Sequence, residues 1–259
     1  MDGRVEYKYL VRNDLLENIR EDLLPYMRAD ALGGQQQNGE YTVRSIYYDT
    51  PELDCYDTKI DGLKIRRKFR IRGYDKPLHD SLVFLEIKRK YAQFIEKHRS
   101  PLLSRDLEAF LACTDVDKYI IPSAGSDRER RDAQRFLYHY HRRRLVPAVL
   151  VVYDREALLG KFDPSIRITF DKNLRGAAYP SPSILYDEAC LQPAMYHSWI
   201  FEVKFFRCAL PAFVRSIIRR YELPRMALSK YAICLDSHPT ISSRAPWRER
   251  LFAASSHSA

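Results

Sequence analysis

The chain has 259 residues and a formal net charge of +9. This length is enough for one large domain or two small ones with a sizeable core. The positive charge favours an anionic partner: nucleic acid, a membrane surface or a phosphorylated small molecule. The five cysteines are odd in number and form no C-x-x-C pair. This excludes the usual zinc sites and disulfide frameworks and favours a reducing compartment.

No segment has the pattern of a membrane span or a signal peptide. The longest uncharged apolar run, residues 145–153, is too short to cross a bilayer. The N-terminal segment MDGRVEYKYL carries charges where a signal peptide needs an apolar core. We therefore expect a soluble, cytoplasmic protein.

Hydrophobic periodicity predicts a chain of strands with helices between and after them. A catalytic domain is expected over 1–236, with a helical insertion over about 104–144, and a disordered tail over 237–259. Helices are also expected after Asn13 or Asp14, from Pro211 to Tyr221, and over 226–235. Strands are predicted at 3–11, 41–50, 64–73, 81–90, 92–102, 148–158, 165–172 and 199–206.

The segment 64–72, KIRRKFRIR, is unusually basic. Side chains of a strand alternate between its faces, so Phe69 and Ile71 lie on one face. The opposite face is a row of cations: Lys64, Arg66, Lys68, Arg70 and Arg72. Taken alone, such a row is most simply a solvated face or a basic patch for nucleic acid.

The same pattern recurs along the chain, with charged or polar residues at positions i and i+2 of other predicted strands. Such charges inside the apolar strands FLEIKRK and WIFEVKFF are costly to bury alone. A sheet closed into a barrel would give each of them a partner in a shared lumen. We therefore predict an α+β fold, a closed antiparallel β-barrel tunnel of about eight strands with helices packed outside. The pairs are Glu6 and Lys8, Arg70 and Arg72, Glu86 and Lys88, Lys97 and Arg99, Tyr153 and Arg155, Arg167 and Thr169, and Glu202 and Lys204.

The charged residues that line the predicted lumen indicate which ligands it can bind. The cations outnumber the carboxylates and suit a polyanion, whereas the carboxylate oxygens suit Mg²⁺ or Mn²⁺. That combination is typical of phosphoryl transfer, in which neutralisation of charge supplies most of the catalysis. His98, between Lys97 and Arg99, is expected to point away from the lumen, and no histidine is expected to be catalytic.

An ordered set of short segments resembles a known family. The segments are EYKYL, IYYDT, FRIRGY, FLEIKRK with EKHRSPL, VYDREAL, SIRITFDKNL, FEVKF and LSKY, which together cover roughly residues 4–235. They resemble the VTC domain, the polyphosphate polymerase branch of the triphosphate tunnel metalloenzymes (CYTH-like superfamily). The resemblance implies a tunnel that binds triphosphate and Mn²⁺ or Mg²⁺. It also implies transfer of the γ-phosphate of ATP to a growing polyphosphate chain, with release of ADP.

The resemblance and the strand pattern together predict the site residues. The residues expected to act on the transferring phosphate are Lys8, Arg70, Arg72, Lys88, Arg155 and Arg167. Further substrate contacts are expected from Lys97, Arg99, Tyr153, Lys204 and Lys230, of which Lys230 depends on the resemblance alone. Glu202 is expected to bind the metal, with Glu6 and Glu86 as further candidates. Alternatively, Glu202, Glu6 and Glu86 pair with lumen cations, and Lys204 is a salt-bridge partner.

The first strand departs from the pattern of many hydrolytic tunnel enzymes. They carry E-x-E-x-K, whereas this chain has Arg4-Val5-Glu6-Tyr7-Lys8. The cation in place of the first glutamate weakens the alternative of a tunnel triphosphatase that hydrolyses inorganic or nucleoside triphosphate. A second alternative is a non-catalytic module that binds polyanions.

The expected partners are ATP and inorganic polyphosphate, without sequence-specific nucleic acid. The chain resembles a stand-alone catalytic domain, so any location at the inner face of a membrane would require a membrane protein partner. The basic helix around 126–144 is a solvated face, or a surface that steers polyphosphate or touches acidic lipid. The oligomeric state is left open.

Overall fold

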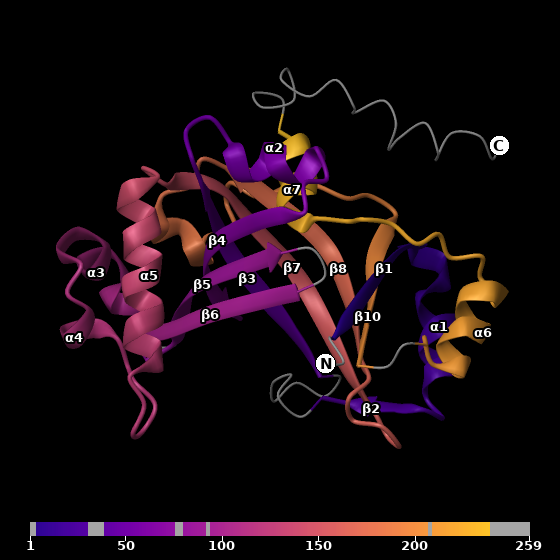
Figure 1. Cartoon of the computed structure of the whole chain (residues 1–259). Helices are drawn as coiled ribbons and strands as arrows, with labels where there is room; N and C mark the ends of the chain where they lie inside the picture. Colours follow the sequence, from indigo (N-terminus) through magenta and orange to yellow (C-terminus); the bar gives the residue numbers. More distant parts are fainter. Residues whose placement is uncertain (1–3, 31–38, 76–79, 92–93, 207–208, 239–259) are drawn as a thin grey trace.

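The computed structural model describes residues 4–30, 39–75, 80–91, 94–206 and 209–238 (Figure 1). In this part of the chain, ten strands form one sheet in which every ladder is antiparallel. The main order is β1-β10-β8-β7-β3-β4-β5-β6, with β2 beside β7 and β9 beside β8. The strands are β1 (Val5–Arg12), β2 (Met27–Ala29), β3 (Glu40–Asp49), β4 (Ile65–Tyr74), β5 (Leu82–Tyr91), β6 (Phe94–Leu103), β7 (Val146–Gly160), β8 (Arg167–Ala178), β9 (Gln192–Pro193) and β10 (Ser198–Phe205).

Helices lie between and after these strands, as the sequence pattern predicts. The helix expected at 226–235 begins only at Lys230, and residues 226–229 before it are not helical. No helix within the described residues is long and apolar enough to cross a membrane. Most of the predicted tail, residues 239–259, lies outside the described residues. The α-helices are α1 (Leu16–Leu23), α2 (Asp54–Ile60), α3 (Leu107–Cys113), α4 (Val116–Tyr119), α5 (Arg128–Arg142), α6 (Ala212–Arg220) and α7 (Lys230–Asp236).

One apolar core lies between the sheet and α3 and α5. Phe69 and Ile71, on the outer face of β4, are fully buried against a cluster that includes Phe136 of α5. His98 also lies on this outer side, since its Nδ1 is 2.7 Å from Asp132 Oδ1 of α5. The alternation predicted for β4, with its apolar and cationic faces, is therefore confirmed, as is the outward direction of His98.

A second core covers the outer face of β1, β8 and β10. Phe170 and Phe201 pack there against Ile19 of α1 and Val214 of α6. Figure 1 places α1 and α6 on the opposite side of the molecule from α3, α4 and α5. Full burial of each aromatic side chain stabilises the fold by about 1.5–3 kcal/mol. The two groups of helices thus pack on the outer face of the sheet through apolar side chains. The charged side chains lie on its inner face.

The predicted closed barrel is wrong. The strands β1 and β6 end the main strand order and are not paired with each other in the described residues. The physical reason is that another segment uses the open edge of β1. Arg225 forms a bridge with Tyr9, and Met226 N donates to Lys8 O at 2.9 Å. Because these backbone groups are already satisfied, β6 has no free donors and acceptors to pair with there.

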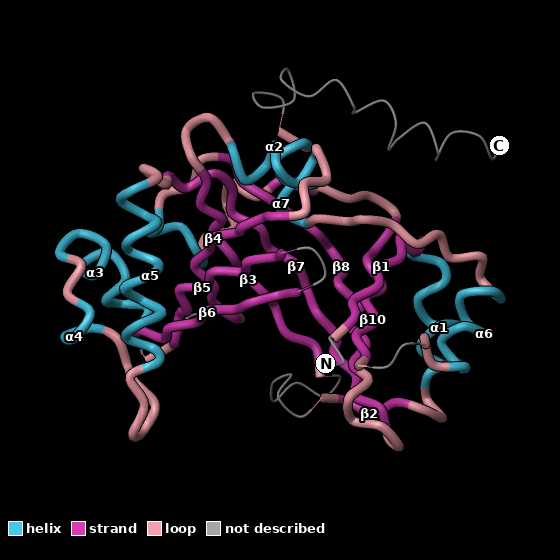
Figure 2. The backbone as a smooth tube through the Cα atoms, viewed as in Figure 1, coloured by secondary structure: helices cyan, strands magenta, loops and turns pink. Residues whose placement is uncertain are grey.

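The open sheet is nevertheless strongly curled. Lys88 of β5 places its Nζ 3.7 Å from Glu6 Oε2 of β1, although five strands separate β1 from β5 in the sheet order. Side chains from the two ends of the sheet therefore meet across its inner, concave face. At one end of this concave face, α2 and α7 lie together (Figures 1 and 2), and Tyr231 of α7 stacks on Tyr47 of β3 with ring centroids 5.0 Å apart.

Candidate functional site

Charged side chains gather on the concave face of the sheet, which we call the charged face. They come from seven strands and from the start of α7. Residues directly opposite in a ladder share a face, so the ladders place the predicted lumen residues together. The cations of the charged face are Lys8, Lys68, Arg70, Arg72, Lys88, Lys97, Arg99, Arg155, Arg167, Lys204 and Lys230, and its carboxylates are Glu6, Glu86, Asp171 and Glu202.

Glu6 and Glu202 form the centre of a first cluster, on the neighbouring strands β1 and β10. Lys8 lies directly opposite Glu202 and places its Nζ 2.8 Å from Glu6 Oε1 and 3.5 Å from Glu202 Oε2. Lys204 pairs closely with Glu202 and lies 3.9 Å from Glu6. Both carboxylates are thus held between lysines.

The electrostatics of this cluster keep its carboxylates ionised. Burial and the charge of Glu202 raise the pKa of Glu6, but Lys8, Lys88 and Lys204 outweigh them and bring it to about 2. Burial also raises the pKa of Glu202, and the same kind of lysine contacts hold it well below its usual range. Two negative charges, on the buried Glu202 and the half-buried Glu6, therefore persist at neutral pH beside the same lysines.

Asp171 organises a second cluster on β8. Its side chain is fully buried and accepts two hydrogen bonds from Arg155, at 2.6 and 2.8 Å. Lys230 Nζ, from the start of α7, lies 2.5 Å from Asp171 Oδ2. Tyr153 supports both cations, with its ring 5.2 Å from the Arg155 guanidinium and 4.7 Å from Lys230 Nζ. Asp171 was not among the predicted site residues, although it continues the alternation of Arg167 and Thr169 and was expected on the same face.

Glu86 is the centre of a third cluster, of arginines. Arg70 Nε donates to Glu86 Oε2 at 2.6 Å, whereas Arg72 and Arg99 lie 3.8 and 3.5 Å from the same carboxylate. Burial raises the pKa of Glu86, but these three arginines bring it to about 2. The Arg99 guanidinium lies 3.6 Å from the centre of the Phe84 ring. Glu86 therefore orients arginines in this structure, and its predicted contact with a metal remains a prediction.

The remaining predicted residues lie at the margins of the charged face. Arg167 NH2 lies 2.9 Å from Asp30 Oδ2, and its Nε, although buried, has no hydrogen-bond partner within the described residues. Lys97 is exposed on β6, directly opposite Lys88. Together with Arg99, it lines the more open side of the charged face.

Several polar residues of the charged face were not predicted as site residues. Tyr47 and Ser45 of β3 accept hydrogen bonds from Arg70 NH1 at 2.8 Å and Arg72 Nε at 3.2 Å. Lys68 is half-buried on the same face as Arg70, two residues earlier on β4. The period of two in KIRRKFRIR already placed Lys68 there, so that signal was available in the sequence.

The donor set around Glu202 fits a hard divalent cation. Glu6 and Glu202 supply carboxylate oxygens, and Thr169, directly opposite Glu202 on β8, has a buried hydroxyl without a hydrogen-bond partner among the described residues. Within the same residues, no three His, Cys, Asp or Glu side chains form a ready metal cage. Mg²⁺ is usually bound by one or two carboxylates, and substrate phosphates complete its coordination.

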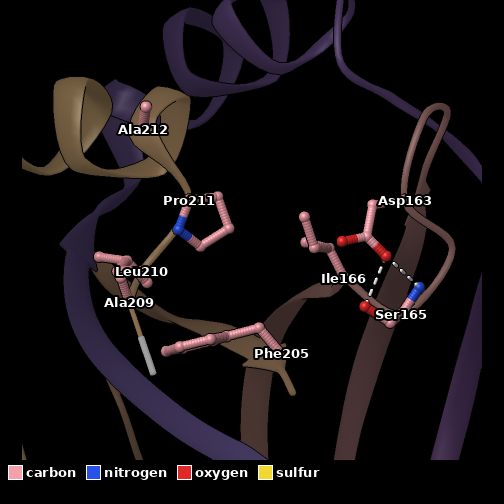
Figure 3. Close-up of a pocket in the computed structure, with 8 residues that line it drawn as sticks. All are labelled: Asp163, Ser165, Ile166, Phe205, Ala209, Leu210, Pro211 and Ala212. Atoms are coloured by element: carbon pink, nitrogen blue, oxygen red, sulfur yellow. Dashed lines mark hydrogen bonds between the residues drawn. The ribbon is translucent and has the colours of Figure 1, made fainter. Parts of the chain in front are cut away.

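A pocket elsewhere in the structure lacks this chemistry. It has a volume of about 240 Å³ and lies between Phe205 and Pro211, on the apolar side of β10 (Figure 3). Its one carboxylate, Asp163, already accepts hydrogen bonds from the Ser165 backbone and hydroxyl, at 3.0 and 2.5 Å. No residue of the charged face lines this pocket, so the candidate site is the charged face.

A curled antiparallel sheet with a cationic inner face and a few buried carboxylates is chemically suited to phosphate-rich anions. The VTC domain family matches residues 3–238, nearly the whole chain. The chain therefore belongs to the VTC domain family, which is linked to polyphosphate metabolism.

The other comparisons add little to this assignment. No curated protein matches the chain significantly. Among solved structures, the PH1819 protein from Pyrococcus horikoshii OT3 is similar, with 14% sequence identity and a TM-score of 0.46. The alignment covers 91% of this chain and 99% of that one.

Proposed function

We propose that the chain is an ATP-dependent polyphosphate polymerase that requires a divalent metal. The observation that carries this proposal is the charged face, on which lysines and arginines from seven strands surround two adjacent carboxylates, Glu6 and Glu202. A linear polyphosphate offers only phosphate oxygens to recognise, and a cationic trough can hold them without reading a base or a sugar. Membership of the VTC domain family supports the same substrate class.

The proposed reaction transfers one phosphoryl group. A terminal oxygen of the polyphosphate chain attacks the γ-phosphorus of ATP and forms the new P–O bond. The bond between the γ-phosphorus and the β,γ-bridging oxygen breaks, and its electron pair leaves with ADP. Because the transition state spreads negative charge over the phosphoryl oxygens, fixed cations stabilise it most effectively.

The arginines of the charged face suit the positioning part of this reaction. Arg155 is held in a fixed orientation by Asp171, and Arg70 is held by Glu86 and Tyr47. Guanidinium groups that are held in advance lose little entropy when they bind phosphate oxygens bidentately. Lys8 and Lys88, which reach toward Glu6 from opposite ends of the sheet, would neutralise charge on the bound phosphates.

Glu6 and Glu202 are the residues that would hold Mn²⁺ or Mg²⁺. When bound, the metal would screen negative charge on the transferring phosphoryl group. Lys8 and Lys204, which now neutralise these carboxylates, would then be free to turn toward phosphate oxygens.

The first strand favours a polymerase over a triphosphatase. Arg4 stands where many hydrolytic tunnel enzymes have a glutamate. Burial lowers the pKa of Arg4, and so does the charge of Arg167, while Glu6 and Glu202 raise it. The group near these two carboxylates is therefore a cation rather than a third metal ligand.

The product of the reaction separates the three candidate functions. With ATP and Mn²⁺, a polymerase forms long chains that gel electrophoresis resolves, a triphosphatase releases only free phosphate, and a binding module leaves ATP unchanged. Chelation of the metal should stop chain growth and leave part of the binding of tripolyphosphate. A nucleic-acid-binding module would show salt-sensitive affinity for DNA or RNA that tripolyphosphate does not displace.

A further inference from the structure

Lys68 is a half-buried lysine of the charged face without a carboxylate partner among the described residues. Its Nζ donates a hydrogen bond to Ser229 Oγ at 2.8 Å. In the part of the chain that the structure describes, no Asp or Glu lies within ion-pair distance of it. An ammonium group that is partly removed from water and has no counter-charge is costly, so this position is suited to an anion that is not part of the protein.

The comparison with Lys8 makes the difference clear. Lys8 is half-buried too, but Glu202 and Glu6 more than offset the effect of burial, and the pKa of Lys8 is raised. Burial lowers the pKa of Lys68 as well, and the nearby cations lower it further, well below its ordinary value. Without a bound anion, Lys68 therefore gives up its proton far more readily than Lys8.

The groups that face Lys68 come from every element around it. They are Lys8 of β1, Tyr47 of β3, Arg70 of its own strand, Lys88 of β5, Lys59 of α2, and Ser229 and Tyr231 at the start of α7. Two rings lie beside the Lys68 amine, since Nζ is 5.9 Å from the centres of both Tyr47 and Tyr231. Apart from these tyrosines and the serine, the neighbours are cations.

Ser229 adds a hydrogen-bond donor to this position. Its hydroxyl oxygen accepts from Lys68 Nζ and, at 3.4 Å, from Ala232 N. Neither contact uses the hydroxyl hydrogen, which remains available for an acceptor. A phosphate oxygen beside Lys68 could accept from it, while the ammonium groups of Lys8 and Lys88 neutralise the phosphate from the other side.

We propose that Lys68, the Ser229 hydroxyl, Lys8 and Lys88 form a further phosphate subsite, in which the bound phosphoryl group is the counter-charge of Lys68. A bound phosphate would raise the pKa of Lys68 back toward its ordinary value, so we expect binding to be accompanied by proton uptake. This subsite rests on the proposed function, since the phosphoryl group belongs either to ATP or to the polyphosphate chain. Both ligands present the same chemistry to Lys68.

The test is calorimetric titration with tripolyphosphate in buffers of different ionisation enthalpy, which counts the protons taken up per ligand bound. At pH about 7, Lys88 contributes little uptake, because burial and its neighbours lower its pKa only to about 8. Lys68→Arg keeps a permanent positive charge and should bind tripolyphosphate with less proton uptake than the wild type. Lys68→Met should lose about 10- to 100-fold in affinity. The control is Arg67→Met, which removes one charge from the outer face of β4 and should change neither quantity.

The outcomes separate the subsite from the proposed function. If Lys68→Met binds as tightly as the wild type, or Lys68→Arg takes up as many protons, the subsite is wrong while the proposed function stands. If the wild type does not bind tripolyphosphate, both are wrong. Titrations with ATP and with longer polyphosphate identify the source of the phosphate. If Lys68→Met loses affinity for both ligands, Lys68 contacts the phosphates of the nucleotide. If it loses affinity for polyphosphate alone, Lys68 contacts the polyphosphate chain.

Discussion

Replacement of Asp171 by asparagine tests whether this carboxylate holds two cations of the charged face ready for phosphate. The side chain of Asp171 is fully buried and pairs with Arg155 at 2.6 and 2.8 Å and with Lys230 at 2.5 Å. Removing one partner of a buried ion pair costs about 3–5 kcal/mol, because the other charge remains buried without compensation. We expect the free energy of unfolding of Asp171→Asn to fall by about that amount, which is a large part of the stability of a typical domain.

Bound phosphate should recover part of this loss. Tripolyphosphate would supply the negative charge that Arg155 and Lys230 lose in the variant, so it should stabilise Asp171→Asn more than the wild type. Urea denaturation with and without tripolyphosphate measures both effects. The control is Asp14→Asn, since Asp14 pairs with Arg12 in the same two-bond geometry but on the surface. Its stability should change by no more than about 1 kcal/mol.

The effect of Asp171→Asn also has a defined pH dependence. Burial raises the pKa of Asp171, but Arg155 and Lys230 outweigh it and lower the pKa. The stabilisation by Asp171 is therefore present above its unfolded pKa of about 4 and is lost as the pH falls through the lower folded value. An Asp171→Asn variant that matches the wild type in stability at neutral pH would refute this reasoning.

Three further predictions concern the other two clusters. Glu202→Gln should lower the rate of chain growth by about 100-fold or more while tripolyphosphate affinity is kept or increased, and unchanged turnover would argue against a metal at Glu202. Arg70→Ala should weaken ATP binding by about 10- to 100-fold, whereas Arg67→Ala on the outer face should not; equal affinities would remove Arg70 from the site. Glu86 has a pKa of about 2, so its stabilisation is present above about pH 4.5 and is lost toward pH 2. Glu86→Gln should therefore flatten the acid limb of the unfolding curve, and an unchanged limb would contradict the arginine pairing.

The sequence was sufficient to predict the two faces of the strands. In β4, the period of two separates Phe69 and Ile71, which are buried under α5, from Arg70 and Arg72 on the charged face. Such alternation is a local property, because one face must be apolar wherever helices cover it. The same reasoning placed His98 on the outer side.

The closure of the sheet could not be predicted in this way. Whether β1 pairs with β6 depends on which distant segment occupies the edge of β1. In this structure that segment is the irregular stretch at Arg225 and Met226. No periodicity marks these two residues. Lys230 is a similar case, since it reaches Asp171 from the first turn of a helix and no strand pattern includes it.

Phosphorus NMR of the purified protein with ATP and Mn²⁺ tests the central claim most directly. The account predicts that a signal of inner polyphosphate groups grows together with ADP, and that one inner phosphate forms for each ADP released. Release of ADP with free phosphate and without inner-phosphate signal would contradict the polymerase and indicate a triphosphatase. ATP that remains unchanged would contradict catalysis by this chain.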